Sequence, residues 1–307
     1  MWAYVVRKLL LTIPTILGVV IITFLLFNVV AKDPARAFAG KKTSPEQLQA
    51  IRHQMGLDKS KFAQFVDVLT FNFPQSMRYQ ESVWSLFARK APVSLAIQLP
   101  VFVIELGLQL VLAMFVASQR GKWPDFTTTF LAVLLMSVPA LSIYLGAQWF
   151  FAGELQWFPV AGWDRGLFPM IHFAALPIIV SVFGGLGGGV RFYRTVALEE
   201  INSDYVRTAR AKGVSEADVL FTHVFRNLLI PVVTNTVTAL PFLVTGALLL
   251  ERLFQIPGFG GLLVDAIHAQ DSPVVMATIY LTAIAYTVML VITDICYALV
   301  DPRVTLK

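Results

Sequence analysis

The sequence predicts an all-α membrane protein with six transmembrane helices, and two observations carry this prediction. Of its 307 residues, 57% are hydrophobic and only 14% are charged, and the mean hydropathy is +0.70. Soluble domains carry about a quarter charged residues, so a water-exposed globule of this composition lacks the charge to cover its surface. In addition, six apolar segments each reach the roughly 20 residues that a helix needs to cross a bilayer. Together the two observations argue against a soluble enzyme.

The six apolar segments carry almost no charge. They run over residues 9–31, 93–118, 127–152, 167–190, 228–250 and 274–300. Only Glu105 and Asp294 place a carboxylate inside a span, and charges at bilayer depth are rare enough to be functional candidates. The first segment is longer than a signal-peptide core and lacks a small-residue cleavage site, so we expect it to be retained. Six spans place both termini on the same side of the membrane.

Lysine and arginine residues in the connections indicate which side that is. With cytoplasmic termini, twelve basic residues lie inside, and the short opposite loops hold only Arg165 and Arg252. The connection 32–92 holds ten more, but its 61 residues are at the length where the positive-inside rule stops applying. Without that connection, the charges favour cytoplasmic termini. The basic residues lie between long apolar runs. For this reason the net charge of +5 indicates a membrane surface and not a nucleic acid as the partner.

The connection 32–92 is predicted to be helical and extracytoplasmic, between a first span at 1–31 and a core domain at 93–307. Ser44 offers an N-cap, with proline next and a Gln47 that can reach back to it, and Gly56 offers the helix end. Apolar residues at helical spacing follow in residues 62–69 and predict a second short helix. We expect these helices to pack on the bundle as a small cap or to lie on the membrane surface.

The connection 191–227 has the most specific pattern. It holds six basic and five acidic residues. Its pattern predicts a helix, then Gly213, then a second helix that starts at Ser215, with Asp218 completing a capping box. Glycine suits the left-handed conformation that ends a helix. Two short helices joined by a tight turn are better suited to docking into a partner's cleft than to lining a pore.

At this point the sequence resembles a known family. The stretch DYVRTARAKGVSEADVLFTHVFRNLLIPVVT (residues 204–234) is similar to the cytoplasmic coupling loop of permease subunits of ATP-binding-cassette importers, of the dipeptide, oligopeptide and nickel group. Five further blocks follow the family's order: RKLLLTIPTILGVVIITFLL, DPAR, LQWFPVAGW, ERLFQIPGFGGLLVDAI and YALVDPRV. The resemblance covers nearly everything except parts of the second and third spans.

The resemblance implies roles for particular residues. Those that couple to the ATPase would be Asp204, Tyr205, Arg207, Ala209, Arg210, Ala211, Lys212 and Gly213. Gly213 matches the family's loop glycine and Ala209 the second alanine of its Glu-Ala-Ala run. Arg207 and Thr208 replace the first two residues of that run, as in the peptide-type group, so a contact made by the missing glutamate does not carry over. The resemblance also makes Phe254 and Phe259 candidates for the entrance of the transport pathway. Glu105 and Asp294 are further pathway candidates, because they are ionisable residues inside spans.

The resemblance also implies partners. The chain has no G-x-x-x-x-G-K-[ST] phosphate-binding loop, so ATP and magnesium are expected in two ATPase subunits. A second homologous permease, an extracytoplasmic substrate-binding protein and a bacterial inner-membrane location follow from the family. The four histidines and Cys296 show no metal-ligand spacing, and no nucleophile motif is present. No catalytic, cofactor-binding or metal-ligating residue is therefore predicted.

Alternatives remain open from the residues alone. The cargo is expected to be a peptide, with nickel complexes or modified peptides next. A self-sufficient ion-coupled carrier would use Glu105 and Asp294 as proton or cation sites, although such carriers often have ten or more spans and internal repeats. The glycine-rich run at 184–189 is either a helix-packing face or a flexible joint leading into the connection 191–227.

Overall fold

The computed structural model describes residues 2–30, 33–40, 43–164, 166–245 and 247–300, and every regular element in these residues is a helix. Three π-helical segments lie at 26–30, 148–154 and 219–224. The α-helices are α1 (Trp2–Leu25), α2 (Pro34–Ala39), α3 (Pro45–Gln54), α4 (Lys61–Leu69), α5 (Val83–Ser118), α6 (Trp123–Ser137), α7 (Ala140–Ala147), α8 (Leu167–Ile201), α9 (Asp204–Ala211), α10 (Glu216–Asp218), α11 (Phe225–Thr245), α12 (Leu248–Leu253), α13 (Phe259–His268) and α14 (Ser272–Val300).

Five of the described helical segments are long and apolar enough to cross a membrane, and they include all or part of α1, α5, α8, α11 and α14. The bent pair formed by α6 and α7 makes a sixth if it is counted as one span. The prediction of an all-α polytopic membrane protein is therefore confirmed.

The third predicted span is not one straight helix. The sequence predicts a span over 127–152, but α6 and α7 meet at an angle of 97°. Pro139 lies at the break, and Val138 before it is extended (φ −91°, ψ 126°). A proline disfavours helical geometry in the preceding residue and cannot donate a backbone hydrogen bond. The predicted third span is thus sharply bent at Pro139.

Other helix boundaries in the structure also differ from the predicted ones. The fifth span was predicted to run through residue 250, but α11 ends at Thr245 and α12 begins at Leu248. Helix α5 begins at Val83, where the Ser82 hydroxyl accepts the N–H of Ser85 at 3.1 Å. The predicted division between residues 92 and 93 therefore falls inside α5. Helix α8 continues eleven residues beyond the predicted end at 190.

The small helices between α1 and α5 form as expected at their caps. The Ser44 hydroxyl accepts the N–H of Gln47, and the Gln47 side chain accepts the N–H of Ser44, each at 3.3 Å. Gly56 follows α3 with a positive φ of 66°. Part of α4 packs on the first span, where Phe65 meets the Phe24 ring edge-on at 5.4 Å. Phe62 points outward and is 76% exposed, so only some of the predicted apolar residues pack on the bundle.

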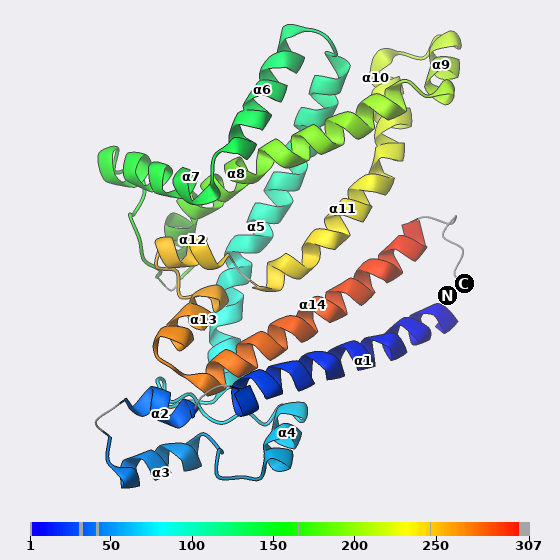
Figure 1. The fold of residues 1–307 in the computed structure, drawn as a ribbon. Coiled ribbons are helices and arrows are strands. Elements are labelled where there is room, and N and C mark those ends of the chain that lie inside the picture. The colour runs from blue at the N-terminus through cyan, green and yellow to red at the C-terminus, as the bar shows by residue number, and fades with distance from the viewer. Residues whose placement is uncertain (1, 31–32, 41–42, 165, 246, 301–307) are drawn as a thin grey trace.

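The helices are arranged with α5 crossing α8 through the middle, while α14 lies between α1 and α11 (Figure 1). The short helices α2, α3, α4, α12 and α13 gather toward one end of the molecule. Helices α9 and α10 lie at the other end, toward which the start of α1 and the end of α14 also point (Figure 1). The two groups of connecting helices are thus separated by the length of the spans.

Candidate functional site

Helices α9 and α10 form a compact elbow between α8 and α11. The N–H of Gly213 donates to the carbonyl of Arg210 at 2.9 Å, and the N–H of Val214 donates to the carbonyl of Ala209 at 3.2 Å. This pair of bonds is a Schellman motif, which needs a residue of positive φ, and Gly213 supplies it at φ 77°. The predicted turn at Gly213 is therefore present.

The start of α10 differs in one detail from the prediction. The Ser215 hydroxyl accepts the N–H of Asp218 at 3.2 Å, as an N-cap should. Its own proton goes to the Asp218 carboxylate at 2.7 Å. A full capping box would need that carboxylate to accept the N–H of Ser215 instead. The predicted box is thus half formed.

An ion pair holds the two arms of the elbow together. The guanidinium of Arg210 donates to the Glu216 carboxylate through Nε at 2.7 Å and through Nη2 at 3.1 Å. At the base of α9, the Tyr205 hydroxyl donates to Glu200 at 2.5 Å. Partial burial and the Glu200 carboxylate raise the pKa of Tyr205, so the phenol keeps the proton that it donates. The first contact joins α9 to α10, and the second joins α9 to the end of α8.

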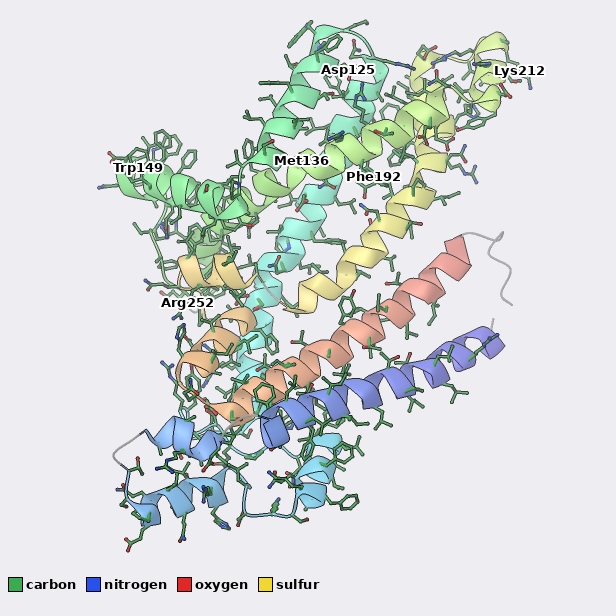
Figure 2. The ribbon with its side chains drawn as sticks, viewed as in Figure 1. Asp125, Met136, Trp149, Phe192, Lys212 and Arg252 are labelled. Atoms are coloured by element: carbon green, nitrogen blue, oxygen red, sulfur yellow. The ribbon has the colours of Figure 1, made fainter. Side chains whose placement is uncertain are left out.

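The two faces of α9 have opposite chemistry. Val206 and Ala209 are buried in an apolar core shared with α5, α8 and α11, which includes Ala113, Met114, Ala117, Tyr193, Ala197, Leu228 and Val232. Of the eight predicted coupling residues only Ala209 faces this core. The others are exposed: Asp204, Tyr205, Arg207, Arg210, Ala211, Lys212 and Gly213. Figure 2 shows Lys212 projecting from the far tip of the elbow. The elbow therefore has a charged outer surface and an apolar inner face that packs on the bundle.

A second ion pair joins the neighbouring helices. Arg194, in the part of α8 that leads to α9, donates to Asp125 through Nε at 2.6 Å and through Nη2 at 2.8 Å. The N–H of Gly121 donates to the same carboxylate at 3.0 Å. The turn between α5 and α6 is thereby tied to the helix that carries the elbow. Sequence reasoning missed this pair because its members are 69 residues apart.

A cavity lined by polar and apolar residues lies within the bundle. The Gln109 amide donates to the Glu105 carboxylate at 2.7 Å and to the carbonyl of Gly185 at 3.1 Å. These groups line a cavity of about 250 Å³ between α5, α8 and α11. On its far wall the Asn235 amide donates to the Tyr193 hydroxyl at 3.0 Å. The structure therefore places Glu105 among polar groups of three spans.

The glycine-rich run in α8 makes room for these contacts. A Cβ at Gly185 would lie 2.2 Å from a carboxylate oxygen of Glu105, and one at Gly189 would lie 2.0 Å from Cδ of Gln109. A Cβ at Gly187 would lie 2.6 Å from the backbone oxygen of Ala132 in α6. Close packing thus accounts for three of the glycines. This finding favours the packing interpretation of the run over the flexible joint.

The other predicted pathway residues lie elsewhere. Phe254 and Phe259 are buried in two separate apolar cores, at 2% and 7% exposure. Neither side chain therefore borders an open path in this conformation. The side chain of Asp294 lies outside the described residues.

Glu251 is a functional candidate that sequence reasoning did not single out. Its carboxylate is 2% exposed and accepts the Ser94 hydroxyl at 2.6 Å and the N–H of Gly261 at 2.9 Å. The Ser94 oxygen in turn accepts the N–H of Phe259 at 2.7 Å. A Cβ at Gly258 would lie 2.4 Å from Cδ of Glu251. The PGFGG turn thus surrounds this buried carboxylate. The glycines of the turn are the sequence feature that could have indicated the role of Glu251.

Replacing Glu251 tests this construction. Glu251→Ala leaves the buried N–H of Gly261 and the Ser94 hydroxyl without their acceptor, which we expect to destabilise the fold by roughly 1–3 kcal/mol. Thermal unfolding of the detergent-purified protein measures the loss. Glu154→Ala is the matched control, because that side chain is exposed and should change little. Equal stability of the two variants would contradict the role assigned to Glu251.

Taken together, the apolar bundle and the elbow define a class: a polytopic membrane protein with a helical elbow outside its spans. Comparison with known proteins identifies the same class. Residues 109–306 match the family described as binding-protein-dependent transport system inner membrane component, and residues 1–80 match its N-terminal membrane component family. The chain belongs to this family, and it is the membrane-spanning permease component of a transport system, located in the inner membrane.

Named relatives share its full length. A dipeptide transport system permease protein of Lactococcus lactis subsp. cremoris is 36% identical over 310 residues, with 99% of each chain covered. A glutathione transport system permease protein of Salmonella typhi is 32% identical over 311 residues, again with 99% of each covered. The similarity therefore extends over the spans, the elbow and the small helices alike.

Proposed function

We propose that the chain forms half of the translocation pathway of an ATP-binding-cassette importer for peptides. The dipeptide and glutathione permeases that it resembles are named for small peptides, which favours peptides over nickel complexes as the cargo. The single observation that carries the coupling role is the division of α9, with a charged face outside and Val206 and Ala209 inside the core of the bundle.

The energy for transport comes from two ATPase subunits docked on the elbow. The exposed charges of α9 and the tip at Lys212 offer the docking surface. This chain holds no cofactor of its own, and ATP and magnesium bind in the partners. A second homologous permease completes the pathway, and an extracytoplasmic substrate-binding protein delivers the cargo near the turn after α12. With the elbow in the cytoplasm, the start of α1 and the end of α14 lie on the cytoplasmic side as well.

Movement of the elbow reaches the spans through packing. Because Val206 and Ala209 share a core with α5, α8 and α11, displacement of α9 by the ATPases must shift those helices as well. The ion pair between Asp125 and Arg194 extends the linkage to α6. Alternating rotation of these helices would open the pathway to one side and then the other, past Glu105.

Reconstitution in vesicles tests this function against an ion-coupled carrier. We expect peptide uptake only when the permease pair, the ATPases, the binding protein and ATP are all present. The chain alone, with a proton gradient imposed, should take up no peptide. Uptake driven by the gradient without ATPases would instead support the carrier, with Glu105 and Asp294 as its ion sites.

A further inference from the structure

We propose that the cavity beside Glu105 binds a primary ammonium group, and that this group is the amino terminus of the cargo. The inference rests on the proposed function as a peptide permease and adds a specificity-determining residue to it. Its starting point is a carboxylate in the middle of α5 that faces a cavity of about 250 Å³ between three spans.

The carboxylate lacks a positive partner. Among the described residues no lysine, arginine or histidine forms an ion pair with Glu105, and its hydrogen bond comes from the neutral amide of Gln109. The most buried acidic groups of the described residues are compensated differently: Asp125 pairs with Arg194, whereas Glu251 and Asp271 each accept a hydroxyl and a backbone N–H. An unpaired charge at bilayer depth is costly and marks a site whose partner arrives from outside.

The carboxylate is held in a fixed position. Gln109 bridges Glu105 and the carbonyl of Gly185, so the amide sets the orientation of the carboxylate relative to α8. The missing side chains at Gly185 and Gly189 leave the room that Glu105 and Gln109 occupy, since a Cβ at either glycine would overlap them. Gln109, Gly185 and Gly189 thus together accommodate the Glu105 carboxylate.

The rest of the lining suits an ammonium group. An ammonium group has three N–H donors and no acceptor, so it needs oxygen atoms around it. Besides the carboxylate, the lining includes the hydroxyls of Tyr193 and Thr236, and the buried Thr236 hydroxyl has no hydrogen-bond partner among the described residues. Phe102 adds an aromatic ring, which favours cations over anions. The volume admits a cationic head group and a few atoms more, which fits the end of a peptide and not its whole length.

Equilibrium binding to the purified complex of permeases and ATPases, without the binding protein, tests the proposal. The probes are glycinamide, which carries an ammonium group and no carboxylate, its neutral analogue N-acetylglycinamide, and potassium chloride. Glycinamide should bind the wild type, bind at least tenfold more weakly to Glu105→Gln, and bind unchanged to Glu154→Gln, which removes an exposed carboxylate. N-acetylglycinamide should not bind.

Gly185→Ala is a second variant, because it keeps the charge but pushes a Cβ into the carboxylate, and it should also weaken glycinamide binding. Basal ATP hydrolysis of each complex reports that it is assembled. Equal glycinamide affinity in wild type and Glu105→Gln would overturn the proposal, as would no binding to the wild type. Potassium binding as tight as glycinamide, with the same dependence on Glu105, would assign the cavity to an inorganic cation and overturn the cargo assignment.

Failure of this inference is distinguishable from failure of the proposed function. If the reconstituted importer takes up a peptide and Glu105→Gln leaves the affinity for glycinamide unchanged, only the inference fails. If the wild-type importer takes up no peptide with every component present, the proposed function fails regardless of what binds beside Glu105.

Discussion

Gly213→Val is expected to abolish transport-stimulated ATP hydrolysis and peptide uptake while leaving membrane insertion intact. Gly213 has a φ of 77°, and this conformation costs a residue with a Cβ about 1–2 kcal/mol, with a β-branched residue least suited to it. Loss of the Schellman turn would change the angle between α9 and α10 and separate Arg210 from Glu216. The ATPases would then meet a surface of the wrong shape.

Asparagine at the same position is the matched control for this effect. A Cβ on Gly213 would have no neighbour within 4 Å among the residues that the structure describes, so steric contact does not explain a loss of coupling. Asparagine tolerates the left-handed conformation better than other residues with a side chain, and Gly213→Asn should keep much of the activity. Hydrolysis of ATP by the reconstituted complex, with and without loaded binding protein, measures both variants. Normal coupling in Gly213→Val would contradict the role of the turn.

Gly187→Ala is expected to destabilise the bundle by roughly 1–3 kcal/mol, because an added methyl group forces the packed helices apart. Its Cβ would lie 2.6 Å from the backbone oxygen of Ala132, which a side-chain rotation cannot move away. Helices α6 and α8 would have to separate, and the ion pair between Asp125 and Arg194 would be strained with them.

The neighbouring glycine offers the control. Gly188 is exposed, and a Cβ there would have no atom of the described part of the chain within 4 Å. Alanine in a helix is about 0.5–1 kcal/mol better than glycine, so Gly188→Ala should be neutral or slightly stabilising. Thermal unfolding of both variants in detergent gives the comparison. Similar melting temperatures for the two would show that the approach of α6 to α8 is looser than described.

Features that depend on nearby residues could be predicted from the sequence. The N-cap at Ser44 and the turn at Gly213 each use side chains or backbone groups within five residues, and both are present. The spans could be found because apolar length is a local property. The family resemblance pointed to the elbow, and its local pattern of caps and glycine supports the same geometry.

Features that depend on tertiary contacts could not be predicted. Pro92 and Pro100 remain inside α5, whereas Pro139 ends a helix, and only the packing around each proline decides between the two outcomes. The hydroxyl of Ser94 reaches Glu251 across 157 residues, which no local pattern indicates. The role of Gln109 could not be predicted either, because its partner Gly185 belongs to another span.

Thiol labelling tests most directly whether the elbow lies in the cytoplasm and binds ATPase partners there. Cys296 is the one cysteine, so Cys296→Ser gives a background for Lys212→Cys on the elbow and for Gln49→Cys on α3 as control. A membrane-impermeant thiol reagent should label Gln49→Cys in spheroplasts, in which the outer face of the inner membrane is accessible. It should label Lys212→Cys only in inverted vesicles, and bound ATPase subunits should protect that position. Labelling of Lys212→Cys in spheroplasts, or no protection by the ATPases, would contradict the account.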